Sequence, residues 1–188
     1  MVTLFNALVF FHVAAAIVWL GSGITLEILE FEAAYGSTRG RIMANLRRGS
    51  WFGARVFAPA AITTILTGIL AVAVGRPTFG QLWVIMALIG VAAAAALGAG
   101  ILGRTSDRLA KRMGEGAPDA EIAAGLARIR AASQLDLAIL VFILFDMVVR
   151  PVAFDPGFFI ASGIFFVAVA CGIILSRTKG QAKALLRG

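Results

Sequence analysis

Five long runs of apolar residues constrain this chain more than any other feature of its sequence. They lie at about 4–26, 52–74, 82–103, 135–152 and 158–176, and few charged residues interrupt them. An α-helix needs about 20 mostly apolar residues to cross a bilayer, and each run is close to that length. Within lipid, a helix satisfies its own backbone hydrogen bonds. The sequence therefore predicts an all-α, polytopic transmembrane helical bundle with five spans.

The composition supports a single integral membrane domain over residues 1–188. Hydrophobic residues make up 60% of the chain and charged residues 14%, whereas soluble domains are about 45–50% apolar and about 25% charged. The net charge of +7 lies mainly between the apolar runs, so the expected partner is the lipid bilayer with its anionic headgroups, and nucleic acid is not expected. The single cysteine, Cys171, excludes an intrachain disulfide.

The positions of Lys and Arg predict the orientation of the bundle. Fifteen of the 17 basic residues lie in residues 27–55, in residues 104–134 and in the C-terminal tail, whereas Arg76 and Arg150 alone lie on the other side. Positively charged loops stay in the cytoplasm. We therefore expect a multi-pass protein of the bacterial cytoplasmic (inner) membrane with its N-terminus outside and its C-terminus in the cytoplasm.

Some helices are expected to extend beyond the apolar runs. Proline is absent from residues 3–35 and 81–113, and after Pro118 none occurs until Pro151. Proline next to an acidic residue is a good helix start, and nothing obvious stops the helix that begins there. These patterns predict cytoplasmic helical extensions at about 27–50 and 104–134.

The only histidine, His12, stands inside the first apolar run. An ionised side chain at the centre of a span costs about 2.5–3.5 kcal/mol on insertion scales, so such residues are rare and often functional. Four interpretations stay open. His12 is a neutral imidazole bonded to a backbone carbonyl or hydroxyl of another helix, an axial ligand of haem iron, a ligand of copper, or a proton relay with Asp146.

A second polar group lies near the end of the fourth apolar run. Asp146 and Arg150 are four residues apart, so they share a helix face, and an ion pair between them would lower the cost of insertion. Pro151 is expected to end the helix. The predicted topology places His12 and Asp146 in the same outer half of the bilayer, and Trp19 lies on the same stripe of the first helix as His12. We therefore predict an outer polar cluster of His12, Asp146 and Arg150, lined by Trp19.

The remaining acidic residues near the cytoplasmic side receive structural interpretations. Glu27, Glu30 and Glu32 are expected to form solvated ion pairs with the many arginines there. Asp136 is expected to pair with Arg55. No nucleophile triad, zinc motif or phosphate-binding loop is present, so no enzymatic activity is assigned.

The first helix also carries a resemblance to known proteins. The segment HVAAAIVWLG, from His12 to Gly21, resembles the H-x6-W-x-G signature of a loose group of small bacterial membrane proteins. The group includes an uncharacterised predicted integral membrane family, the membrane part of copper resistance protein CopD and the HemJ-type protoporphyrinogen oxidase. Further matching pieces are Thr67-Gly68, Asp136, Asp146 and Arg150-Pro151. The resemblance implies binding of haem b or of a metal ion, with His12 as the ligand.

Three functional hypotheses follow. The first is a CopD- or HemJ-like membrane protein that binds haem or a metal ion through His12, with Trp19 lining the site. Because the chain has one histidine, a homodimer would supply a second imidazole. The second hypothesis is a non-catalytic accessory subunit that packs in a larger membrane complex. The third is a proton- or ion-coupled transporter that uses His12 and Asp146.

Overall fold

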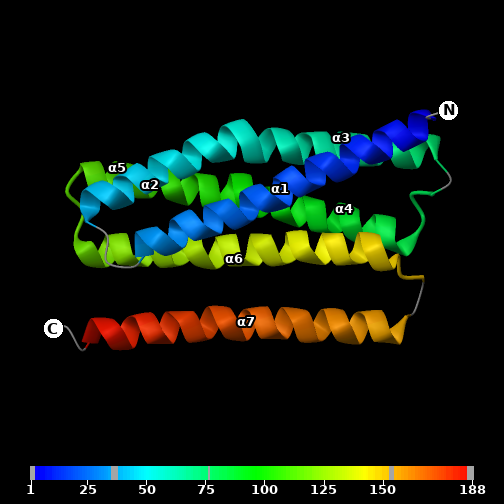
Figure 1. Cartoon of the computed structure of the whole chain (residues 1–188). Coiled ribbons are helices and arrows are strands. Elements are labelled where there is room, and N and C mark those ends of the chain that lie inside the picture. The colour runs from blue at the N-terminus through cyan, green and yellow to red at the C-terminus, as the bar shows by residue number, and fades with distance from the viewer. Residues whose placement is uncertain (1–2, 35–37, 76, 153–154, 186–188) are drawn as a thin grey trace.

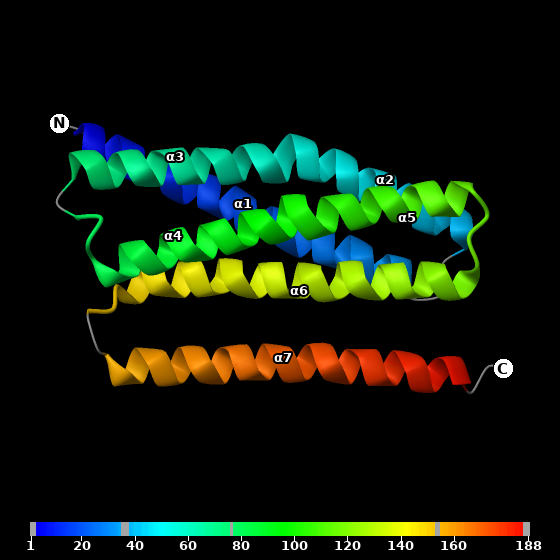
Figure 2. The same cartoon turned by 180° about the vertical axis from the view of Figure 1, so that it is seen from behind.

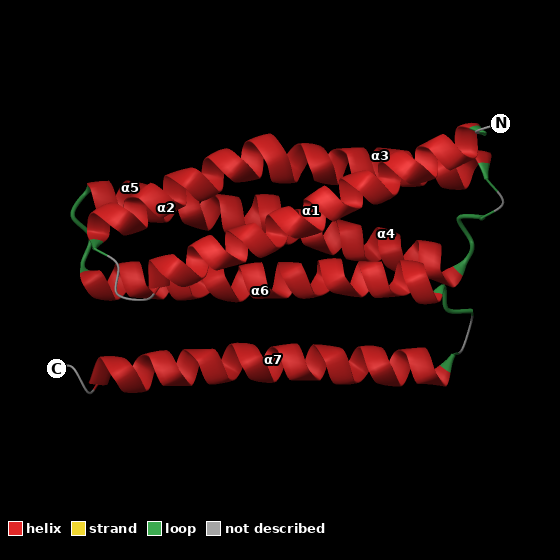
Figure 3. Ribbon diagram, in the orientation of Figure 1, coloured by secondary structure: helices red, strands yellow, loops and turns green. Residues whose placement is uncertain are grey.

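The computed structural model describes the backbone of residues 3–34, 38–75, 77–152 and 155–185, and the side chains of these residues except 31–34 and 175–185. Every regular element in the described residues is helical (Figure 3). Five helices are long and apolar enough to cross a membrane, which confirms the predicted all-α fold with five spans. These candidate spans are Leu4–Glu30, Arg39–Val74, Leu82–Gly114, Asp119–Val149 and Pro156–Ile174.

Two of the five long helices are interrupted by π-helical turns. Helix α1 spans Leu4–Ala34, α6 spans Asp119–Val149 and α7 spans Pro156–Leu185. The second long helix consists of α2 (Arg39–Phe52), the π-helical segment η1 (Gly53–Phe57) and α3 (Ala58–Val74). The third consists of α4 (Leu82–Ala95), the π-helical segment η2 (Ala96–Gly103) and α5 (Arg104–Gly114).

The first four long helices form the bundle, and α7 lies at its side. Helix α1 packs against both α3 and α6, and α4 packs against α6, whereas α3 and α4 make little direct contact (Figures 1 and 2). Helix α7 packs on α6, where the rings of Phe142 and Phe145 meet Phe158 and Phe166 with centroids 5.3–6.1 Å apart. We call the end of the bundle where α2 and α5 lie the α2–α5 end.

The centre of the bundle is a small apolar cluster. Its buried members are Trp19, Ala60, Ala87, Ala94, Leu140 and Ile143. Gly90 lets α4 approach α6 closely, because a Cβ atom there would lie 2.7 Å from a side-chain carbon of Ile143. Small residues at such contacts allow helix backbones to approach in lipid.

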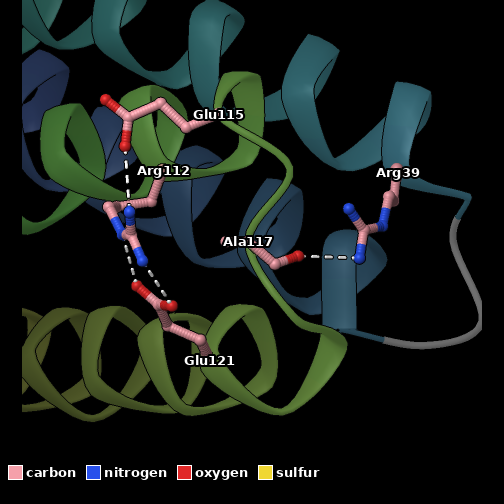
Figure 4. Close-up of polar contacts among 5 residues, drawn as sticks. All are labelled: Arg39, Arg112, Glu115, Ala117 and Glu121. Atoms are coloured by element: carbon pink, nitrogen blue, oxygen red, sulfur yellow. Dashed lines mark hydrogen bonds and ion pairs between the residues drawn. The ribbon is translucent and has the colours of Figure 1, made fainter.

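A second apolar cluster closes the bundle at the α2–α5 end, and exposed ion pairs surround it. Its buried members are Ile42, Leu109, Met113, Ala117, Ile122 and Ile129. Arg39 donates to the Ala117 carbonyl at 2.8 Å, and Arg112 bonds both Glu115 and Glu121 (Figure 4). Arg39 also donates to the Asp119 carboxylate at 2.6 Å. Exposed ion pairs contribute little individually to stability. Packing in the apolar cluster therefore contributes most to holding α2, α5 and α6 together.

Candidate functional site

His12 is fixed by a hydrogen bond to the neighbouring helix α3. Its Nδ1 lies 2.8 Å from the backbone oxygen of Thr64, and a carbonyl only accepts, so Nδ1 carries the proton. Gly68 provides room for the ring, because a Cβ atom at that position would lie 2.8 Å from His12 Cε1. The interpretation of His12 as an imidazole bonded to a backbone carbonyl of another helix is therefore confirmed. Its Nε2 stays available for a further contact.

Asp146 is completely enclosed in the bundle. Its exposed fraction is 0%, and neither carboxylate oxygen has a hydrogen-bond partner. The predicted ion pair with Arg150 is wrong. Helix α6 ends at Val149, and Arg150 adopts a left-handed conformation with φ 51°, so the four-residue spacing no longer brings the two side chains together. The guanidinium lies 5.5 Å from the ring centroid of Trp83 instead.

The polar and aromatic contacts of the described residues do not join any two members of the predicted outer cluster. The described contacts of His12 are with Thr64 and Gly68 of α3, whereas Asp146 lies on α6, and no hydrogen bond between these two described residues is present. Trp19 is 6% exposed and belongs to the central cluster, where it packs edge-on against Phe57. Its indole Nε1 is buried without a hydrogen-bond partner.

A cavity lies on the other side of Trp19, toward the α2–α5 end. This cavity has a volume of about 530 Å³, and all four long helices of the bundle line it. Ligand pockets usually have volumes of about 300–1,000 Å³. We call it the acidic cavity, because Glu30, Asp107 and Asp136 are among the described residues that line it and no Lys or Arg is among them. A chain with a net charge of +7 thus places three acidic side chains around this cavity.

Two carboxylates of the acidic cavity lack part of their hydrogen bonding. Asp136 is 5% exposed, and its Oδ1 has no partner. The half-buried Glu30 also has one oxygen, Oε2, without a partner. Glu30 interacts with the Ser133 hydroxyl and with the charges of Glu27 and Arg130. An incompletely satisfied buried carboxylate is costly unless a proton or a cation joins it.

One expectation for these acidic residues is wrong. Asp136 does not pair with Arg55, whose guanidinium lies 5.2 Å from the centroid of the exposed Trp51 ring. Glu27 and Glu30 are half-buried rather than fully solvated, and each has one buried carboxylate oxygen without a hydrogen-bond partner. Glu32 lies outside the residues whose side chains are described. The α1–α6 contact turns Glu30 and Asp136 toward the interior, and the sequence does not show which helices are neighbours.

Both π-helical segments border the acidic cavity. Gly53, Ala54 and Phe57 of η1 line one side, and Gly98, Ala99, Leu102 and Gly103 of η2 line the other. Short π-helical turns within α-helices occur frequently at functional sites. Their position on both walls, next to Asp136, marks the acidic cavity as the principal candidate site. The sequence signal that could have found it is the pair Glu30 and Asp136 within otherwise apolar helical stretches.

Comparison with known proteins identifies the family. Residues 6–151 match the family model described as predicted integral membrane protein, DUF2269. The chain belongs to this family. The matched region contains His12, Trp19, Glu30, Asp136 and Asp146 and excludes α7. No curated protein and no solved structure matches the chain. The likeness to CopD and HemJ-type proteins stays a resemblance, and roles as an accessory subunit or homodimer stay predictions.

Proposed function

We propose that this integral membrane protein is a proton-linked carrier of cations, with the acidic cavity as its binding site. The observation that carries the proposal is the unpartnered, 5% exposed carboxylate of Asp136 on the wall of a cavity of about 530 Å³. A buried carboxylate without a full set of partners is stabilised by a cation or by a proton. Because the two compete for the same oxygen atoms, binding of one releases the other.

The basic residues around the α2–α5 end support an orientation in which the acidic cavity lies near the cytoplasmic side. Arg47, Arg48, Arg108 and Lys111 are exposed there, and positive segments stay in the cytoplasm. Asp146 would then be a second proton-binding group deeper along the path. It lies ten residues further along α6 than Asp136, which corresponds to about 15 Å at about 1.5 Å per residue.

The test is proton exchange in proteoliposomes that contain a pH-sensitive dye. Na⁺, K⁺, tetraethylammonium and octyltrimethylammonium are added outside in turn, and proton movement is compared with protein-free vesicles. We expect at least one of these cations to drive proton exchange in the wild type. Asp136→Asn should abolish it, whereas Asp155→Asn, at the start of α7 and away from the acidic cavity, should retain it. Absence of exchange for all four cations would refute the proposal.

A second candidate function retains His12 as an axial ligand of haem. The specific observation is the Nδ1 hydrogen bond to the Thr64 carbonyl at 2.8 Å, because ligating histidines usually donate their other N–H to such an acceptor. Haem held by Nε2 would supply electron-transfer chemistry. We propose haem rather than copper, because the described residues contain no group of three or more His, Cys, Asp or Glu side chains placed to bind a metal ion.

The absorption spectrum of the purified protein tests the haem proposal. Protein expressed with added haem precursor should show a Soret band that His12→Ala removes. The control is Asp146→Asn, which leaves the imidazole in place and should retain the band. A colourless wild-type protein, or a band unchanged in His12→Ala, would exclude His12 as the ligand.

A further inference from the structure

The acidic cavity opens sideways, between the second and third long helices. Its exposed lining residues, together with the half-buried Ala58, follow two stripes with four-residue spacing. One edge consists of Ser50, Ala54, Ala58 and Ile62, and the other consists of Ala95, Ala99, Gly103 and Asp107. Ile62 has an exposed fraction of 56% although it lines the cavity. Since α3 and α4 make little direct contact, these stripes form the two edges of a lateral mouth.

The length of the mouth matches one leaflet of a bilayer. Each stripe covers twelve residue steps, or about 18 Å at about 1.5 Å per residue. Half of a hydrocarbon core about 30 Å thick is about 15 Å. The edges from Ala54 to Ile62 and from Ala95 to Gly103 lie within the predicted apolar runs, so they face lipid chains. The opening therefore connects the cavity to the membrane interior.

The mouth is polar at one end and apolar at the other. Ser50 and Asp107 form its edges toward the α2–α5 end, whereas Ile62 and Ala95 form them toward the centre of the bundle. We call the α1 and α6 walls of the cavity the floor. Gly23 on this floor lies near Leu137, Leu140 and Phe57, next to the central cluster.

The carboxylate of Glu30 lies on the side of Gly23 nearer the α2–α5 end, and Asp136 lies at the level of Gly23, directly before Leu137 on α6. A ligand in the cavity thus meets carboxylates on both α1 and α6, with apolar side chains beyond them toward Trp19 and Ile62.

We infer that the ligand of the acidic cavity is a single-chain amphiphile with an ammonium head, which enters from the leaflet next to the α2–α5 end. The ammonium group lies by Glu30 and Asp136, and the apolar chain extends toward Trp19 and Ile62. This assignment rests on the proposed cation carrier and names its substrate class. Phosphate-bearing headgroups are disfavoured, because the described lining carries three carboxylates and no Lys or Arg. A volume of about 530 Å³ also suits one chain better than two.

Fluorescence quenching of Trp19 tests the inference directly. In a Trp51→Phe, Trp83→Phe background, Trp19 is the remaining tryptophan, and it lines the end of the cavity. A brominated alkyltrimethylammonium in phosphatidylcholine vesicles should quench it along a saturable curve. A brominated alkyl sulfonate of equal chain length and brominated phosphatidylethanolamine should quench only in proportion to their amount. Saturable quenching by the sulfonate, or by the phosphatidylethanolamine alone, would overturn the inference.

Substitutions in the floor and at the mouth separate binding from entry. Glu30→Gln with Asp136→Asn should weaken the saturable component about 10- to 100-fold, the loss for removing a charged partner. Ala54→Phe with Ala99→Phe should abolish it by filling the mouth. Ala96→Phe is the matched control, because Ala96 is exposed on the same helix but does not line the cavity. Equal quenching in the mouth variant and the control would refute lateral entry.

Circular dichroism shows whether each variant is folded. Competition by unlabelled alkyltrimethylammonium tests binding on the wild type, so this result does not depend on the folding of a variant. Failure of the inference is distinguishable from failure of the carrier. Proton exchange driven by Na⁺ or tetraethylammonium, without saturable quenching, would refute the amphiphile as ligand but support the cation carrier. Saturable quenching without proton exchange would refute the carrier but support an amphiphile-binding site.

Discussion

Asp136 and Asp146 lie on the same helix and are both buried, yet their surroundings differ in one respect. Asp136 borders a cavity of about 530 Å³, whereas Asp146 has an exposed fraction of 0% and does not line that cavity. Both have carboxylate oxygens without hydrogen-bond partners. A carboxylate next to free space can accept a ligand larger than a proton, but an enclosed one cannot. Adjacent space, rather than burial alone, therefore separates a candidate binding site from a candidate proton site.

Chemical labelling should give the largest contrast between the two residues. A hydrophobic carbodiimide reaches protonated carboxyl groups from the lipid and leaves an N-acylurea adduct that mass spectrometry detects. We expect adducts at Asp136 and Glu30, because the lateral mouth admits the reagent, and none at Asp146. Ala54→Phe with Ala99→Phe should prevent labelling. Labelling of Asp146 at the rate of Asp136 would abolish the distinction.

Substitutions of the two residues should also differ in their effect on the free energy of unfolding, with the larger effect at Asp146. Asp146→Val removes an enclosed, unpartnered carboxyl group, so we expect the free energy of unfolding to rise by about 1–3 kcal/mol. Asp136→Val should raise it less, by under about 1 kcal/mol, because the cavity lets other molecules solvate that carboxyl group. Reversible unfolding in mixed micelles measures both values. A destabilised Asp146→Val variant would reveal a stabilising contact for the carboxylate.

The contact of His12 with α3 predicts a third effect. Gly68→Ala places a Cβ atom 2.8 Å from His12 Cε1, so the ring must move and its bond to Thr64 weakens. We expect a loss of about 1–3 kcal/mol in the free energy of unfolding. Gly21→Ala in α1 is the control, because nothing lies within 4 Å of its added Cβ atom. That substitution should be neutral or stabilising, by up to about 1 kcal/mol. Equal values for both variants would argue against the ring contact.

The exposed ion pairs at the α2–α5 end should give the smallest effect. Arg112→Ala removes the bonds to Glu115 and Glu121, which are about half exposed. Water and salt screen such pairs. We expect a small decrease in Tm that shrinks further in high salt. A large decrease that persists in high salt would show that these bonds, rather than the apolar cluster of Ile42, Leu109 and Ile129, hold α5 to α6.

The sequence predicted the fold better than the site. Hydropathy alone identified the five spans, because their length and composition leave few alternatives in lipid. Pro151 marked the end of α6 to within two residues of Val149. The predicted Asp146–Arg150 ion pair was wrong at the same place, because residue spacing alone does not reveal the left-handed conformation of Arg150.

The acidic cavity was missed for a different reason. Its walls depend on the neighbours of each helix and on two π-helical turns, and neither has a signature in a single sequence.

The π-helical turn η1 has a consequence for the evolution of the mouth. A turn with i→i+5 bonds contains one residue more than a turn with i→i+4 bonds. Deleting one residue within Gly53–Phe57 would thus restore a regular helix and leave the lipid-facing and inward-facing sides of α2 and α3 in their present alignment. A related protein that lacks one residue at this point would keep the same bundle, but the edge of its mouth at the position of Ala54 would be a regular helix and the mouth would be narrower.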